Sequence, residues 1–151
     1  MTSLADSLEK LRRIDSERGP KYVADFEAVL ADIAALRDPA CIAELARFFN
    51  DAAPFDELMF SIIHTIEIFD DKAYVGGLLS IAPMLCAQAP RWASIVFVRS
   101  LNAEATRREL VKQLRGAPTA TKSAVRDLMQ KINARSPEFL AKTTVVIVAA
   151  T

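Results

Sequence analysis

Three prolines recur along the chain at nearly equal intervals, and this spacing constrains the fold more than any other feature. Pro20, Pro54 and Pro90 lie 34 and 36 residues apart, and helical patterns fill the intervals. A period of this length is typical of α-solenoids, in which each repeat contributes two antiparallel helices. We therefore expect an all-α fold, a short HEAT-like α-solenoid of antiparallel helix pairs, with each proline opening a pair. An irregular helical bundle is the alternative.

Apolar residues recur at intervals of three and four along most of the chain, which indicates about eight to nine amphipathic helices in a single domain, residues 1–151. Polar residues at the expected helix starts are candidate N-caps, namely Ser3, Asp70 or Asp71, and Asn102. The segment 143–148 is rich in β-branched residues, which disfavour helix modestly. We expect the last helix to fray there.

Acidic and basic residues are segregated along the sequence, although the formal net charge is zero. Residues 1–71 carry fifteen acidic and seven basic side chains, whereas residues 72–151 carry four acidic and twelve basic ones. A strongly signed surface steers and selects a charged partner. The sequence also contains no Ser/His/Asp elbow and no phosphate-binding loop. These observations favour a binding protein over an enzyme.

Cysteine usage and hydropathy limit the cellular compartments in which we expect the protein. Cys41 and Cys86 lie far apart and form no CxxC pair, which is the pattern of buried thiols in a reducing compartment. The N-terminal segment lacks the basic start and apolar run of a secretory signal. The uncharged segment 73–90 is shorter than a membrane span requires. We therefore expect a cytoplasmic protein that does not enter a membrane.

A helical wheel gives the segment 55–71 two distinct faces. Its apolar residues fill one arc, which we expect to be core. The opposite arc holds Glu57, Phe60, His64, Glu67 and Asp71. An exposed aromatic rimmed by carboxylates is typical of an interface hot spot, and packing of Phe60 on a neighbouring repeat is the alternative. Because one histidine and two carboxylates are a poor metal cage, we expect no metal or other cofactor.

Two stretches of the chain resemble a known family. They are DELMFSIIHTIE at residues 56–67, followed by Phe69, Asp70, Asp71 and Tyr74, and then APRW at 89–92 and RSLN at 99–102, with Arg107 beyond. This pattern, over roughly residues 50–140, resembles the helical immunity proteins of bacterial polymorphic toxin systems, in particular immunity protein 30. The resemblance implies a cytoplasmic protein that binds the toxic C-terminal domain of a cognate effector, as in contact-dependent growth inhibition. Many such toxin domains are nucleases, often acting on tRNA.

The resemblance and the charge pattern together give a specific hypothesis. A nuclease must attract phosphates, so its cleft is usually basic, and an acidic surface can occupy or block it. We expect a monomer that binds its toxin 1:1. The expected partner-binding residues are Asp56, Glu57, Phe60, His64, Glu67, Asp70, Asp71 and Trp92. For Trp92, half-buried packing between repeats is the favoured role and contact with a partner is the alternative. For Asp70 or Asp71, helix capping is the alternative role.

The basic half allows other interpretations. Eight cationic residues spread over the last helices, namely Arg107, Arg108, Lys112, Arg115, Lys122, Arg126, Lys131 and Arg135. They suit a HEAT-like scaffold or an RNA-binding protein. However, few aromatics are interleaved with them, and the acidic half would repel phosphate, so we do not expect direct nucleic-acid binding. A HEAT-type repair glycosylase is a third interpretation, and the segregation of acids from bases along the sequence disfavours it.

Overall fold

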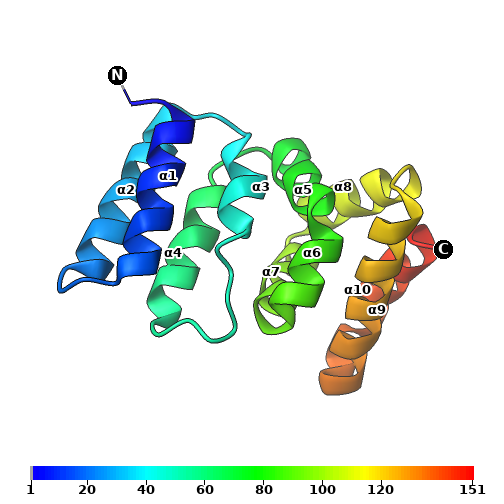
Figure 1. Ribbon diagram of the computed structural model, residues 1–151. Coiled ribbons are helices and arrows are strands. Elements are labelled where there is room, and N and C mark those ends of the chain that lie inside the picture. Colours follow the sequence, from blue (N-terminus) through cyan, green and yellow to red (C-terminus); the bar gives the residue numbers. More distant parts are fainter. Residues whose placement is uncertain (1) are drawn as a thin grey trace.

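The computed structural model describes residues 2–151, and within that range every regular element is a helix (Figure 1). None of these helices is long and apolar enough to span a membrane. The prediction of an all-α fold is confirmed. The elements are α1 Leu4–Glu17, α2 Tyr22–Leu36, α3 Cys41–Ala46, α4 Asp56–Ile66, α5 Asp71–Ser80, α6 Ala82–Gln88, α7 Pro90–Asn102, α8 Glu104–Arg115, α9 Thr119–Arg135, the 3-10 helix η1 Pro137–Phe139 and α10 Leu140–Ala149.

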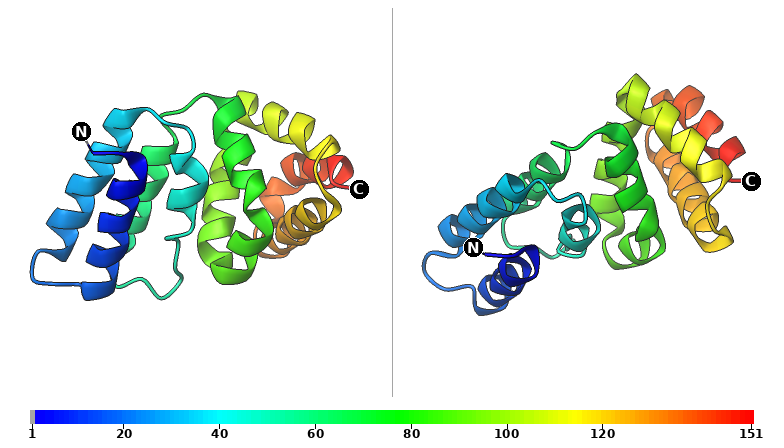
Figure 2. Two further views of the ribbon diagram at one scale, coloured as in Figure 1. Left: turned by 45° about the horizontal axis from the view of Figure 1, so that its top comes forward. Right: turned by 90° about the horizontal axis from the view of Figure 1, so that it is seen from above.

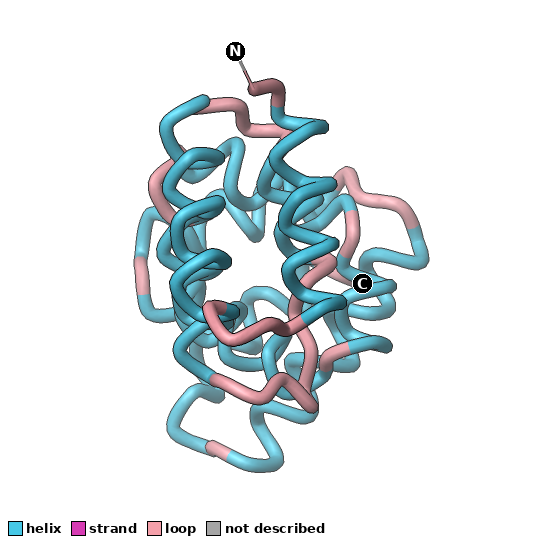
Figure 3. Tube along the Cα trace, turned by 60° about the vertical axis from the view of Figure 1, so that its left-hand side comes forward, coloured by secondary structure: helices cyan, strands magenta, loops and turns pink. Residues whose placement is uncertain are grey.

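The first seven helices form two layers. α1, α3 and the consecutive helices α5 and α6 lie in one layer, and α2, α4 and α7 lie in the other (Figure 2). α1 packs beside α2, as Figure 3 shows from that end of the molecule, and α3 packs beside α4. α9 packs against α6 and α7, and α10 packs against α8 and α9 at the far end. Each helix pair thus contacts mainly its neighbours along the stack.

The three regularly spaced prolines lie at or just before the starts of the helices in the second layer, α2, α4 and α7. Pro20 lies in the turn before α2, Pro54 lies shortly before α4, and Pro90 is the first residue of α7. Proline suits the start of a helix because its missing N–H would have no partner there in any case. The expectation that each proline opens a pair is therefore wrong, since it opens the second helix of a pair. The spacing of a repeat gives the length of each helix pair, but not which helix of the pair follows the proline.

Local sequence explains most helix boundaries. The Ser3 hydroxyl accepts a hydrogen bond from the Asp6 backbone N–H at 3.1 Å and caps α1. The Asp70 carboxylate accepts one from the Ala73 N–H at 2.8 Å and caps α5. Both caps agree with the sequence prediction. Pro83 separates α5 from α6, because its ring conflicts with the preceding turn and it has no N–H to donate.

Two C-terminal features differ from the prediction. Asn102 is the last residue of α7 and does not cap α8; its side-chain oxygen accepts a hydrogen bond from Lys142 Nζ at 3.0 Å. The last helix, α10, continues to Ala149 without fraying in its β-branched segment. Thr143 and Val146 are both fully buried in this segment. Packing against α8 and α9 therefore outweighs a weak intrinsic preference.

One hydrophobic core runs along the stack. Its largest fully buried side chains are Trp92, Phe26, Phe49 and Phe97. In the first layer α3 and α5 approach closely at Gly77, where an added Cβ would lie only 2.5 Å from Ile42 Cγ2. Glycine is needed at this position because any side chain would push the two helices apart.

Candidate functional site

Most of the residues predicted to bind a partner gather where α4 faces α7. Few backbone contacts join these two helices, so side chains bridge them. At one end, Arg91 donates two hydrogen bonds to the Asp56 carboxylate, at 3.3 and 2.9 Å. At the other end, Arg99 donates two to the Glu67 carboxylate, at 2.9 and 2.7 Å. We refer to the surface formed by Asp56, Phe60, Glu67, Arg91 and Arg99 as the α4–α7 seam.

An aromatic pair lies between the two ion pairs. The rings of Phe60 and Trp92 meet edge to face, with centroids 5.1 Å apart and an interplanar angle of 81°. Phe60 is 37% exposed, whereas Trp92 is fully buried. Phe60 therefore packs on a neighbouring helix, as the alternative interpretation expected, and still presents part of its ring to solvent. Its role as an interface hot spot stays a prediction.

The buried position of Trp92 favours packing over contact with a partner. Its ring stacks on Phe49 with centroids 6.2 Å apart, and the Arg91 guanidinium lies 4.9 Å from its centroid. The Asp51 carboxylate accepts hydrogen bonds from the backbone N–H groups of Arg91 and Trp92, at 3.0 and 3.2 Å, and so caps the first turn of α7. The buried ring of Trp92 thus supports the partly exposed ring of Phe60.

The remaining predicted residues differ in their availability. Glu57 and His64 are exposed on α4, on the same side as Phe60. Asp70 serves as the N-cap of α5, which is the alternative role that the sequence suggested. Asp71 accepts a hydrogen bond from the Thr106 hydroxyl at 2.6 Å. Its carboxylate thereby ties α5 to α8.

The two ion pairs make the seam less acidic than the sequence predicted, because Arg91 and Arg99 come from the basic half of the chain. The hydrogen bonds between Arg91 and Asp56 lower the pKa of the Asp56 carboxyl below its usual value and raise the pKa of Arg91. Bidentate pairs of this kind fix the geometry of both groups. The seam therefore presents carboxylates in set orientations.

These ion pairs were not predicted from the sequence, although one pattern in it indicates them. Arg91 lies 35 residues after Asp56, and Arg99 lies 32 residues after Glu67. Both separations are close to the proline period. Opposite charges placed about one repeat apart are therefore candidates for pairing between successive helices of a layer.

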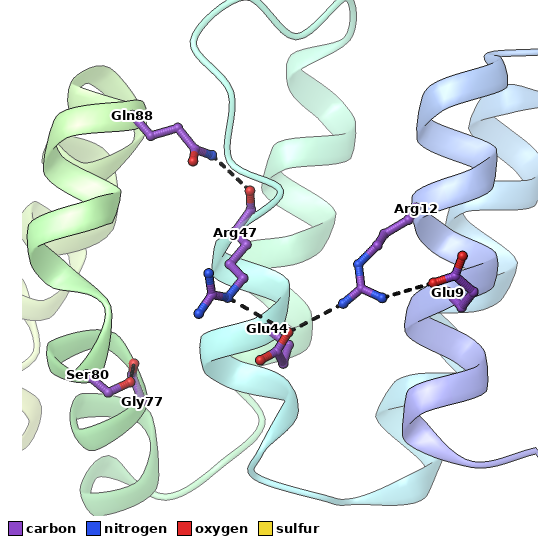
Figure 4. Close-up of polar contacts among 7 residues, drawn as sticks. All are labelled: Glu9, Arg12, Glu44, Arg47, Gly77, Ser80 and Gln88. Atoms are coloured by element: carbon purple, nitrogen blue, oxygen red, sulfur yellow. Dashed lines mark hydrogen bonds and ion pairs between the residues drawn. The ribbon is translucent and has the colours of Figure 1, made fainter.

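A cleft separate from the seam, with a volume of about 400 Å³, lies among α1, α3 and α6. Glu44 stands between Arg12 and Arg47, at 3.5 and 3.8 Å, and Arg12 also pairs with Glu9 at 3.3 Å (Figure 4). Gln88 Nε2 donates to the Arg47 carbonyl at 2.9 Å. These polar groups already form ion pairs and hydrogen bonds with one another, so they give no evidence for a ligand in the cleft.

Some cations of the basic half make hydrogen bonds within the chain. Arg107 donates to the Leu101 carbonyl, Arg108 pairs with Glu104, and Arg126 donates to a backbone carbonyl near the C-terminus. Three of the eight cations thus make bonds within the chain. Nothing in their arrangement favours nucleic-acid binding over binding of a protein.

Side chains that could carry metal or nucleophilic chemistry are not gathered at the seam. Among residues 2–151, no group of three or more His, Cys, Asp or Glu side chains is placed to hold a metal ion. Cys41 and Cys86 are free, and burial raises the pKa of each thiol to about 11. Neither thiol is therefore a ready nucleophile near neutral pH.

Comparison with known proteins identifies one family. The model of the family described as immunity protein 30 matches residues 12–110. The match includes α4, α7 and every residue of the seam, and it begins and ends earlier than the stretch of roughly residues 50–140 whose pattern resembles the family. No curated protein and no solved structure matches the chain. The HEAT-like class of the stack therefore stays a prediction.

Proposed function

Because the chain belongs to the immunity protein 30 family, we propose that it neutralises the cytotoxic C-terminal domain of a cognate toxin by binding it through the α4–α7 seam. The toxin is a nuclease of a contact-dependent growth inhibition system, and the two proteins meet in the cytoplasm as a 1:1 complex. The observation that carries the proposal is the exposed ring of Phe60, which is held between two ion pairs within the segment that the family model matches. The protein acts by covering the toxin and performs no catalysis.

Phe60 has the properties of an interface anchor. Energetic hot spots are mostly large, well-supported side chains near the centre of a contact, surrounded by groups that exclude water. Trp92 holds the Phe60 ring from one side, and the ion pairs flank it along α4. Since these groups are ordered before binding, association costs little side-chain entropy.

The carboxylates near Phe60 make the seam selective for a basic partner. Glu57 is exposed, and Asp56 and Glu67 present oxygen atoms in orientations that their arginines fix. A nuclease surface that attracts phosphate carries lysines and arginines that can share these carboxylates. Because arginines already offset part of the charge, we expect binding to weaken with salt, but less steeply than at a bare acidic surface.

The direct test is isothermal titration of the protein with the toxin C-terminal domain encoded immediately upstream, at low and high salt. Phe60→Ala is expected to weaken binding at least about tenfold, as for a hot-spot residue. Phe55→Ala is the matched control, because Phe55 is 44% exposed just before α4 and its ring packs near Tyr22 of α2 rather than on Trp92. Its affinity should stay within about twofold of wild type. Equal effects of the two substitutions would contradict the assignment of the seam.

A further inference from the structure

A polar pocket opens where α4, α5, α7 and α8 meet, at the Arg99 end of the seam. Its volume is about 200 Å³. Its polar lining consists of Glu67, Asp71, Tyr74, Arg99, Ser100 and Thr106. We refer to it as the junction pocket. It is continuous with the proposed binding face, because Glu67 and Arg99 belong to both.

Tyr74 brings an unsatisfied hydroxyl to the junction pocket. Its side chain is 5% exposed, and its hydroxyl has no hydrogen-bond partner among residues 2–151. The nearby Ser100 hydroxyl donates instead to the Val96 carbonyl at 3.2 Å. Burial raises the pKa of Tyr74 to about 12, and Ser100 opposes the rise to a smaller extent. The neutral hydroxyl can therefore both accept and donate a hydrogen bond at neutral pH.

A buried polar group without a partner is rare in a folded protein, and each instance requires a cause. The indole N–H of Trp92 is also unsatisfied, but it lies in the packed core. The Tyr74 hydroxyl differs because its side chain lines an open polar pocket. The oxygen is covered in the free protein, so a polar group that enters the pocket supplies the missing hydrogen bond only after a lining side chain shifts.

The charged groups of the junction pocket favour a cation. Two carboxylates, Glu67 and Asp71, face one guanidinium, Arg99, so the formal charge is −1. Arg99 is already bound to Glu67 through two hydrogen bonds. Within the described residues, the Asp71 carboxylate receives one side-chain hydrogen bond, from Thr106. Since an ionised carboxylate has about four acceptor positions, Asp71 can bind a further donor.

We propose that the junction pocket receives a lysine side chain of the toxin, whose ammonium group donates hydrogen bonds to the Asp71 carboxylate and to the Tyr74 oxygen. This inference rests on the proposed function and specifies its partner chemistry. Lysine fits better than arginine because its compact ammonium group has three rotatable donors, whereas a guanidinium needs a planar partner. Of the two planar carboxylates at this site, Glu67 is already held by Arg99, and one oxygen of Asp71 already accepts from Thr106.

The test uses the same titration with the upstream-encoded toxin domain and the full chain. Tyr74→Phe removes one oxygen atom and is expected to weaken binding about tenfold, because the ammonium group loses an acceptor. The unfolding midpoint of the free variant should be unchanged or higher, since the lost hydroxyl has no partner. Asp71→Asn is expected to weaken binding further, because it removes the charge that the cation meets.

Tyr22→Phe is the matched control. The Tyr22 hydroxyl donates to Asp15 at 2.7 Å, away from the seam, so its loss should lower stability and leave affinity unchanged. Alanine substitution of each toxin lysine, combined with Tyr74→Phe, should reveal one lysine whose effect is smaller in the Tyr74→Phe background, because only its bond to Asp71 remains.

The outcomes separate this inference from the proposed function. Tight binding by wild type with unchanged affinity for Tyr74→Phe, or the absence of any coupled lysine, would overturn the pocket assignment alone. A wild-type protein that gives no heat with the toxin domain would contradict the proposed function for that toxin, and with it this inference.

Discussion

Arg99 of α7 binds Glu67, which directly follows α4, through two hydrogen bonds of 2.9 and 2.7 Å. The side chain of Glu67 is 29% exposed and that of Arg99 is 41% exposed. Solvent therefore screens the pair, and its contribution to stability is modest. Its larger effect is geometric, because it joins two helices whose backbones make few contacts.

Glu67→Gln is expected to lower the free energy of unfolding by about 0.5–1 kcal/mol, because the amide can keep one hydrogen bond but loses the charge. Urea unfolding followed by circular dichroism measures this change. Glu104→Gln is the matched control, since it breaks the more exposed Glu104–Arg108 pair within α8. Its cost should be smaller, about 0.3 kcal/mol. A larger cost for the control would contradict the bridging role of Glu67.

Trp92 should be the costlier member of the aromatic pair to remove. As the only tryptophan, it makes native fluorescence a direct report on burial, and emission should shift to longer wavelength on unfolding. Trp92→Ala is expected to destabilise by about 3–5 kcal/mol, because it leaves a cavity in the core. Phe60→Ala should cost less, since part of its ring already contacts solvent. Equal losses, measured by circular dichroism, would contradict this packing.

The parts of the fold that depend on neighbouring residues could be predicted from the sequence. Helical periodicity gave the all-α class, and the caps by Ser3 and Asp70 follow from side chains three residues before the N–H groups they satisfy. The split at Pro83 could also have been anticipated, because proline removes a helical hydrogen bond. Which helix of each pair follows the proline could not be predicted, since this depends on which helices pack together.

The site was predicted less well because its contacts join distant helices. Asp56 and Glu67 looked like free acids, yet their partners lie one repeat further along the chain. Two other side-chain contacts have similar separations, Ser61 with Glu27 at 34 residues and Thr106 with Asp71 at 35 residues. Packing of Trp92 between repeats was predicted, but its complete burial depends on contacts such as those with Phe49 and Phe60, which come from distant parts of the chain.

Stability is expected to fall at alkaline pH. The pKa values of Cys41 and Cys86 rise from 9.0 to about 11 on burial, and those of Tyr22 and Tyr74 rise from 10.0 to about 12. The folded state therefore keeps protons that the unfolded chain releases. Its advantage is complete below about pH 9 and is lost as the pH rises through about 11 to 12. Urea midpoints across this range measure the loss, and a flat profile would contradict these shifts.

Glu57→Lys tests the charge of the proposed binding face without disturbing an ion pair. The substitution should slow association with the toxin domain about tenfold or more at low salt, because a cation then faces a basic partner. Glu138→Lys makes the same charge change on an exposed residue of η1, outside the family match. Stopped-flow kinetics should show little change for this control. Equal slowing by both would indicate a general effect of net charge.

Gly76 and Gly77 test how closely α3 approaches α5. A Cβ at Gly77 would lie 2.5 Å from Cγ2 and 2.7 Å from Cβ of Ile42, which is fully buried. A Cβ at Gly76 would meet only the end of the Gln113 side chain, at 3.3 Å. Alanine is favoured over glycine within a helix by about 0.5–1 kcal/mol.

Gly76→Ala is therefore expected to leave stability unchanged or to raise it by up to about 1 kcal/mol. Gly77→Ala should destabilise by about 1–3 kcal/mol, because overpacking outweighs the gain in helix preference. Urea unfolding of the two variants gives the comparison directly, since both substitutions add the same methyl group to the same helix. Stabilisation by both would mean that α3 and α5 lie further apart than the contact at Ile42 requires, whereas opposite signs would locate the tightest point of the first layer at Gly77.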